Sequence, residues 1–198
     1  MAVGSHGDKR KLGAFGFTLL EIMVVVAIIS LLASVATPMY GKYLRRTKTS
    51  EALTNIRKIY DGELAYYHED HVLASGNLAS KQFLYCSAEP SEHPTDQKRR
   101  GNFERGNWPL IHFSTDGPIY YTYLVEVSPD PDPVPDRPSW IPGFGEDPES
   151  IWMAAMLIRA FGDLDHDGNV SQFARWAFVN ENAQLRGMAG VAALDELE

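Results

Sequence analysis

One short run of the sequence carries aspartates at alternate positions followed by a glycine: Asp163, Asp165, Asp167 and Gly168. Carboxylates at positions 1, 3 and 5, with glycine at the tight turn, form the first half of an EF-hand loop, whose hard oxygen ligands suit Ca²⁺. Asn169 would add a carbonyl, and Ser171 a hydroxyl or a water contact. Because the twelfth position is Ala174 and not Glu, the pattern predicts a partial calcium loop. An Asp-rich turn between two strands is the alternative.

Glu21 is the one charged residue in an apolar run of 20 residues, Phe17 to Ala36. A helix rises about 1.5 Å per residue, so this run would be roughly 30 Å long and would cross the hydrocarbon core of a bilayer. A carboxylate in that environment is costly unless it is paired or protonated. Glu21 therefore either meets a cation from another group or lies at the membrane edge, where the positive end of the helix dipole stabilises it.

The other reactive side chains do not show the spacing of a catalytic site. The sequence has no Ser/His/Asp arrangement and no nucleotide-binding loop, and its six histidines are scattered. Cys86, the single cysteine, lies in no activating motif and cannot form an intramolecular disulfide. A net charge of −8 argues against nucleic acid as the primary ligand. We therefore expect a protein that is not an enzyme.

The element that must position Glu21 is a long N-terminal helix, which we predict over residues 17–69, with 17–36 crossing the membrane. Pro38 removes a backbone donor, so a kink or a local break is expected there. Apolar residues then recur at three- and four-residue spacing: Ala52, Leu53, Ile56, Ile59, Tyr60, Leu64 and Tyr67. This stripe is typical of an amphipathic helix packed on a globular head. Charged residues such as Glu51 and Glu63 are expected on the remaining face.

A short basic patch, Lys9-Arg10-Lys11, precedes the apolar run, and Gly16-Phe17-Thr18-Leu19-Leu20-Glu21 leads into it. Lysine and arginine also follow the run, so charge alone leaves its orientation across a membrane open. A basic leader, Gly followed by Phe, Glu four residues later, an unbroken apolar run and Pro38 near its end resemble the N-terminus of type IV pilins and type II secretion pseudopilins. The resemblance covers residues 9 to about 70 closely and the remainder loosely.

The resemblance implies that residues 1–16 are a leader, which prepilin peptidase removes between Gly16 and Phe17 on the cytoplasmic side. The new amine of Phe17 would be N-methylated and would pair with Glu21 of a neighbouring subunit, which sets the register of assembly; Pro38 belongs to the same assembly helix. The chain would first be a single-pass protein of the inner membrane. At an inner-membrane assembly platform it would then join copies of itself or other pilins in an extracellular pilus or a periplasmic pseudopilus.

Residues 70–198 are expected to form the globular head, which we divide into a connection (70–109), a β-hairpin (110–127), a proline-rich loop (128–149) and C-terminal strands with the Asp loop (150–198). Residues 151–161 could form a strand or a short helix, and we favour a strand because the hairpin needs a partner in an antiparallel sheet. We place a closing strand at 173–179 and a small-residue tail at 187–198. Alternate residues of the hairpin would face the core: Ile119, Tyr121, Tyr123, Val125 and Val127. The expected fold class is α+β, with the C-terminal half of the helix packed on roughly four antiparallel strands, the pilin fold.

The resulting hypothesis is a structural subunit, major or minor, of a type IV pilus or fimbrium, with a role in adhesion or motility. A pseudopilin of a type II secretion system is the first alternative. A monomeric, membrane-anchored calcium-binding domain is the second, although a simple anchor needs neither Gly16-Phe17 nor Glu21. The single Cys86 cannot form the disulfide that holds the C-terminal loop of many pilins, and calcium bound at the Asp loop would take over that role.

Overall fold

The computed structural model describes residues 17–90, 93–128, 140–142, 152–180 and 182–196. The predicted leader, residues 1–16, and most of the predicted proline-rich loop lie outside the described residues. The chain divides into two compact units, residues 1–41 and residues 42–198. The second unit, the head, contains the C-terminal part of the long helix and every strand that the structure describes.

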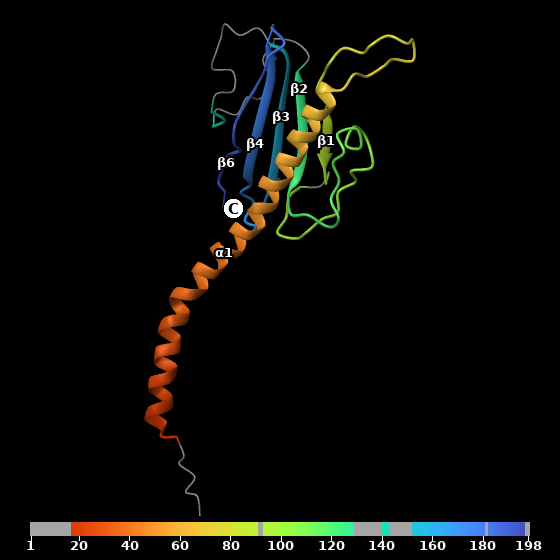
Figure 1. Ribbon diagram of the computed structural model, residues 1–198. Coiled ribbons are helices and arrows are strands. Elements are labelled where there is room, and N and C mark those ends of the chain that lie inside the picture. Colours follow the sequence, from red (N-terminus) through yellow and green to blue (C-terminus); the bar gives the residue numbers. More distant parts are fainter. Residues whose placement is uncertain (1–16, 91–92, 129–139, 143–151, 181, 197–198) are drawn as a thin grey trace, which may run out of the picture. The chain divides into compact units, whose positions relative to one another are not determined.

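The described elements follow the order α1 (Leu19–His68), β1 (Cys86–Glu89), β2 (Thr122–Ser128), β3 (Trp152–Gly162), β4 (Ser171–Asn180), β5 (Leu185–Gly187) and β6 (Ala192–Leu194) (Figure 1). The predicted α+β class is confirmed: a long N-terminal helix packs through its C-terminal half on an antiparallel sheet. α1 remains helical through Pro38.

The strands form one antiparallel sheet in the order β1-β2-β3-β4-β5, and β6 also pairs with β4. β5 pairs with residues 177–179 of β4 and β6 with residues 172–174, so the two short strands share one edge. The described sheet has six strands, more than the roughly four that the sequence predicts. β1 lies inside the predicted connection. β5 and β6 are three residues long, too short for side-chain alternation to reveal them in a sequence.

Residues 110–112 lie in a turn and Phe113 follows it, so the prediction that residues 110–113 are the first strand of a hairpin is wrong. The N–H of Phe113 donates to the carbonyl of Trp108 at 3.2 Å, and the N–H of His112 to that of Pro109 at 3.1 Å, which coils this segment. Ile111 and Phe113 are nevertheless buried. The alternating apolar residues of this segment are therefore buried, although the segment is not a strand. The strands that pair with β2 are β1 and β3.

The main core is formed by side chains of α1 and of the sheet. Figure 1 shows the C-terminal half of α1 lying across one face of this sheet. The centre of the core combines the predicted helix stripe with alternate residues of the strands: Ala52, Ile56, Ile59, Tyr121, Tyr123, Val125, Met156, Ile158 and Phe173. The predicted inward positions from Ile119 to Val125 are confirmed as buried. Gly62 lets α1 approach the turn closely, because a Cβ at this position would collide with the carbonyl oxygen of Ile111.

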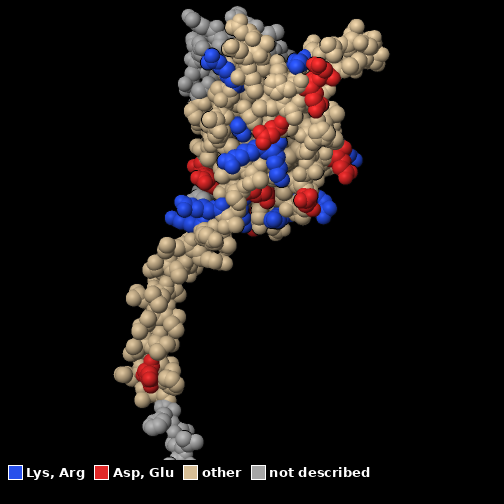
Figure 2. Space-filling model, viewed as in Figure 1, with Lys and Arg blue, Asp and Glu red and all other residues tan. Residues whose placement is uncertain are grey.

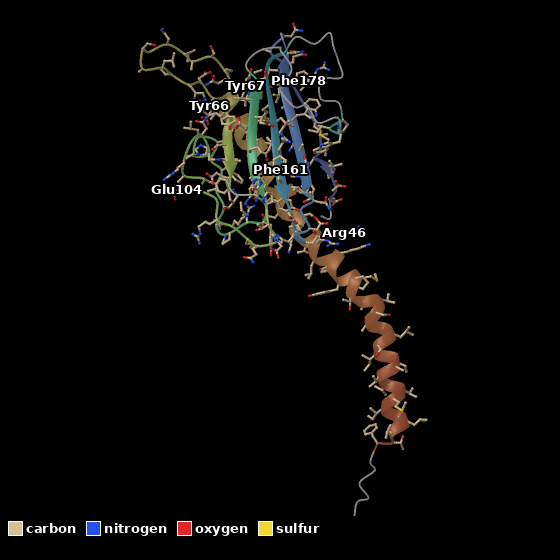
Figure 3. All side chains as sticks on the ribbon, turned by 180° about the vertical axis from the view of Figure 1, so that it is seen from behind. Arg46, Tyr66, Tyr67, Glu104, Phe161 and Phe178 are labelled. Carbon is tan, nitrogen blue, oxygen red and sulfur yellow. The ribbon has the colours of Figure 1, made fainter. Side chains whose placement is uncertain are left out.

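The opposite face of the sheet carries a second, smaller apolar cluster: Ile141, Ala155, Leu157, Ala174, Trp176 and Phe178. Figure 3 shows the molecule from behind, with this face toward the viewer and Phe178 of β4 labelled. The indole N–H of Trp176 donates to the carbonyl of Pro142 at 3.2 Å, so the described residues 140–142 lie against this face. Both faces of the central strands are therefore covered, which explains why β3 and β4 are largely apolar.

Candidate functional site

The predicted methylation and assembly residues Phe17 and Glu21 lie at the start of α1, and Pro38, the other predicted assembly residue, lies inside the same helix. Phe17 is exposed and precedes the helix, which begins at Leu19. The hydroxyl of Thr18 accepts the backbone N–H of Glu21 at 3.1 Å and caps the helix. Glu21 lies in the first turn, where unpaired N–H groups favour a negative charge. Gly16 lies outside the described residues.

Sequence reasoning missed the role of Thr18, although a signal for it was present. Thr18 and Glu21 have the S/T-x-x-E spacing of a capping box. The cap fixes where α1 starts, so Phe17 stays outside the helix while Glu21 is inside it. The one carboxylate of the apolar run is thereby held close to the end of the chain that cleavage after Gly16 would create.

Every side chain from residue 17 to residue 44 is exposed. One 18-residue window of α1 has a mean hydropathy of 2.7 and no buried residue, so by length and composition the helix can cross a membrane. The hydroxyls of Ser30, Ser34 and Thr37 donate to carbonyls of their own helix at 2.7–2.9 Å. These polar groups need no outside partner, so the segment offers an almost entirely apolar surface that lipid or other helices can cover.

Polar residues of α1 tie its C-terminal half to the sheet. The carboxylate of Glu51 accepts the N–H groups of Tyr120 at 2.9 Å and Tyr121 at 3.4 Å. The side-chain amide of Asn55 donates to the hydroxyl of Tyr123 at 3.0 Å. Burial raises the pKa of the Glu51 carboxyl, and these hydrogen bonds partly oppose that shift. The contacts fix how α1 meets the start of β2.

Glu63 is fully buried, so the prediction that it lies on the exposed face of the helix is wrong. One carboxylate oxygen accepts the N–H of Leu84 at 2.9 Å, and the other lies 4.0 Å from the Sγ of Cys86. Burial raises the pKa of Glu63 to about 7 and also raises that of the Cys86 thiol. Glu63 follows Ile59 by four residues and therefore lies on the same face of the helix. The spacing of the apolar residues was a better guide to the burial of Glu63 than its charge.

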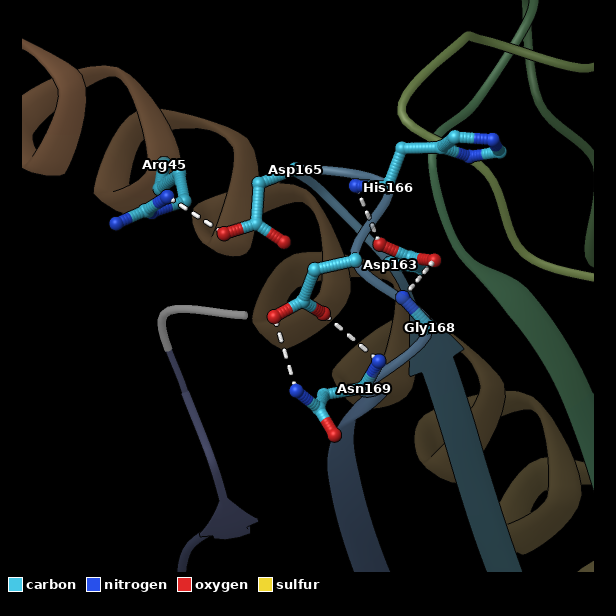
Figure 4. A network of polar contacts seen from close by, with 7 residues as sticks. Arg45, Asp163, Asp165, His166, Gly168 and Asn169 are labelled. Atoms are coloured by element: carbon cyan, nitrogen blue, oxygen red, sulfur yellow. Dashed lines mark hydrogen bonds and ion pairs between the residues drawn. The ribbon is translucent and has the colours of Figure 1, made fainter.

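The structure brings the three aspartates of the predicted calcium loop together at the turn between β3 and β4 (Figure 4). One carboxylate oxygen from each of Asp163, Asp165 and Asp167 lies within 4.8 Å of the others. Ca²⁺ binds oxygens at about 2.3–2.6 Å, so three oxygens this close can reach a single ion. The donor type and the spacing therefore fit a hard cation.

The protein itself already supplies donors to these carboxylates. Asp163 accepts the N–H groups of His166 at 2.7 Å and Gly168 at 3.3 Å. Asp165 forms an ion pair with Arg45 of α1 at 2.8 Å, as Figure 4 shows. Asp167 accepts both the backbone N–H and the side-chain amide of Asn169, at 2.8 and 2.9 Å. A metal ion would compete with Arg45 for Asp165.

Ser171, the last predicted ligand, is engaged elsewhere. Its hydroxyl is buried and bonds to the carbonyl of Gly162 at 2.9 Å and to the hydroxyl of Tyr121 at 3.3 Å. These contacts place Ser171 at the first residue of β4, where it holds the base of the turn. Sequence reasoning missed Arg45, because nothing in the sequence signals a contact between residues 120 positions apart.

The family described as the prokaryotic N-terminal methylation motif matches residues 13–37. The type IV major pilin protein PilA of Myxococcus xanthus is 46% identical over 54 residues, which are 27% of this chain and 24% of the relative. The type IV major fimbrial protein FimA of Dichelobacter nodosus is 54% identical over 39 residues, 20% of this chain and 24% of the relative. A fimbrial protein of Pseudomonas aeruginosa is 49% identical over 41 residues, 21% of this chain and 27% of the relative.

The chain thus spans about a quarter of the length of these curated relatives. A search of the solved structures found no significant match. The matched family motif covers residues 13–37, and the relatives named here match 39 to 54 residues of the chain.

Proposed function

We propose that the chain belongs, through its N-terminal region, to the type IV pilin and fimbrial protein family, because that region is similar to the relatives named above. The chain is a structural subunit of a type IV pilus that polymerises through residues 17–41. The observation that carries this proposal is the exposed, apolar start of α1 with Glu21 in its first turn. Such a surface is stable only in lipid or against other apolar helices, and a filament of α1 helices supplies the second environment.

The proposed function has two stages, one in the membrane and one in the filament. In the first, α1 crosses the inner membrane, and prepilin peptidase cleaves between Gly16 and Phe17. In the second, the amine of Phe17, once N-methylated, pairs with Glu21 of a neighbouring copy or another pilin at an inner-membrane assembly platform. A charged pair satisfies both groups where a lone carboxylate in an apolar bundle would be costly. The role is structural and includes no enzymatic step.

Processing is tested by mass spectrometry of the intact chain isolated from membranes. We expect a mature protein that begins at methylated Phe17. A Gly16→Val chain should keep residues 1–16, whereas Gly13→Val, the same substitution three residues earlier, should be processed normally. A protein that begins at Met1 in the unmodified chain would contradict the proposal and favour a simple membrane anchor.

Assembly is tested by Glu21→Ala. Because this variant removes the partner of the Phe17 amine, we expect normal cleavage but a loss of subunits from sheared filaments. Ser30→Ala, which changes another polar residue of the same apolar segment, is the matched control and should assemble. Normal incorporation of Glu21→Ala would remove the assembly role of this carboxylate.

The alternative of a pseudopilin in a type II secretion system shares the processing and the helix. The named relatives are pilins and fimbrial proteins, which favours the pilus. Electron microscopy of sheared cells, followed by mass spectrometry of the filaments, separates the two. Long extracellular filaments that contain the chain support the pilus, and a chain confined to the periplasm supports the pseudopilus.

We also propose that the Asp loop binds one calcium ion through Asp163, Asp165 and Asp167, with the carbonyl of Asn169 as a further ligand. The close approach of the three carboxylates supports this. Bound calcium would hold the β3–β4 turn in a chain whose single cysteine forms no intramolecular disulfide.

A further inference from the structure

Two basic residues of α1, Lys42 and Arg46, lie one helical turn apart at the start of the head. Both are exposed, and neither forms an ion pair within the described residues. Their neighbours are engaged: Arg45 pairs with Asp165, and the ammonium group of Lys48 lies 4.6 Å from the ring centroid of Tyr120. Figure 2 shows Lys and Arg side chains gathered at the lower end of the head.

The position of this pair along α1 matches the thickness of a membrane. Lys42 is the first charged residue after Glu21, and the 20 residues between them carry no charge. At about 1.5 Å per residue these 20 residues span roughly 30 Å, the depth of the hydrocarbon core. Tyr43, which is 67% exposed, lies beside the pair, and tyrosine is enriched at membrane interfaces.

We propose that Lys42 and Arg46 bind the phosphate of an anionic phospholipid headgroup in the outward-facing leaflet. The proposal rests on the membrane-anchored stage of the proposed function. Side chains four residues apart lie on one face of a helix, so the ammonium and the guanidinium can reach the same phosphate. Their long aliphatic stems can follow the apolar surface while the charged ends remain at the headgroups. The bound lipid would fix the depth of the head before assembly.

An acidic surface of a second copy is the competing occupant, because the chain has a net charge of −8. The lipid is favoured by the direct continuity of the pair with the apolar segment and by the exposed tyrosine beside it. In a filament the same two side chains would be released from lipid.

The test measures lipid retention by native mass spectrometry of the full chain in a nonionic detergent, with equal amounts of phosphatidylglycerol or phosphatidylcholine. We expect preferential retention of phosphatidylglycerol. A Lys42→Gln/Arg46→Gln chain should bind it more weakly by on the order of 25-fold, since each basic residue near a membrane contributes about fivefold. Arg57→Gln/Lys58→Gln, which neutralises two exposed basic residues farther along the same helix, should bind as the unmodified chain does.

A charge-preserving Lys42→Arg/Arg46→Lys chain should retain the lipid, which separates loss of charge from loss of folding. The basic leader is common to all these chains and cancels in the comparison. Equal retention of the two lipids, an unchanged affinity in Lys42→Gln/Arg46→Gln, or an equal loss in the Arg57/Lys58 control would overturn the proposal. Salt-sensitive association of copies without a lipid preference would also overturn it and assign the pair to a second copy. The measurement needs neither cleavage nor a filament, so its failure differs from a failure of the proposed function.

Discussion

Glu63 is a carboxyl group buried without a cationic partner. No lysine or arginine contacts it among the described residues; its contacts are the N–H of Leu84 and the thiol of Cys86. Burial raises its pKa from 4.5 to about 7, so the folded head binds a proton more tightly at this site than the unfolded chain does. The stability of the head therefore depends on pH through Glu63, and Glu51, whose pKa burial also raises, contributes in the same direction.

We predict that the free energy of unfolding falls as pH rises. The contribution of Glu63 is fully present below its unfolded pKa, near 4.5, and is lost as pH rises through about 7. The loss between pH 4.5 and pH 8 amounts to at most about 3 kcal/mol. Urea unfolding of the detergent-solubilised chain at several pH values, followed by tryptophan fluorescence, measures it. Glu63→Gln should flatten the dependence, whereas Glu69→Gln, at an exposed carboxylate after the helix end, should leave it unchanged. A Glu63→Gln chain with the full slope would exclude Glu63 as its source.

At the level of elements, the spacing of the apolar residues and the length of each segment determined whether the segment could be predicted from the sequence. The stripe of α1 and strands β3 and β4 have enough residues for their patterns to be visible, and the sequence located them closely. Residues 110–113, which are a turn and the residue after it, are predicted as a strand because two buried residues, Ile111 and Phe113, alternate within a segment too short to separate strand from turn. The strands β1, β5 and β6 carry three or four residues each and owe their existence to pairing partners.

For two glycines of α1, we predict that substitution by alanine changes stability in opposite directions. Gly62→Ala would push a Cβ against the carbonyl of Ile111, so the free energy of unfolding should fall by about 1–3 kcal/mol. Gly41→Ala meets no atom within 4 Å, and alanine favours a helix over glycine, so the stability of α1 should rise by up to about 1 kcal/mol. Urea unfolding reports the first change, and helical circular dichroism of the full chain reports the second. Equal effects of the two substitutions would contradict the close packing of α1 on the turn.

The β3–β4 turn gives the calcium prediction. Thermal unfolding should shift upward by several degrees with calcium and return with a chelator, because an ion that binds only the folded chain stabilises it. Asp165→Asn should remove most of this shift, while Asp116→Asn, in an exposed turn elsewhere, should retain it. Arg45→Gln removes the competing cation and should strengthen calcium binding. If the melting temperature does not change with calcium and no ion is bound, the calcium proposal is contradicted. The Asp loop is then an ordinary turn held by the ion pair between Arg45 and Asp165.

At the scale of the whole molecule, the start of α1 can be read from the sequence better than the head can. The cap at Thr18, the charge of Glu21 and the apolar run that follows are local features of the sequence. The roles of Phe17 and Glu21 in processing and assembly stay predictions. The contacts of Arg45 with Asp165 and of Glu51 with Tyr120 join positions 120 and 69 residues apart, and their formation depends on the complete fold. Such pairs leave no mark on spacing or composition, so they appear only in the structure.

The division of the chain at Gly41 predicts that the head folds without the apolar segment. Every side chain from residue 17 to residue 44 is exposed, and the first buried residue of α1 is Thr49, so residues 17–41 add nothing to the core of the head. We expect a chain of residues 42–198 to be soluble and monomeric, with a free energy of unfolding within about 0.5 kcal/mol of that of the full chain in detergent. All four tryptophans follow residue 42, so the same fluorescence signal reports both proteins, and light scattering gives their mass.

As the control, a chain of residues 53–198 lacks the contacts of Glu51 with Tyr120 and Tyr121 and should be markedly less stable. An unfolded 42–198 chain would mean that the apolar segment supports the head, and the assignment of residues 17–41 to lipid and filament contacts alone would then fail.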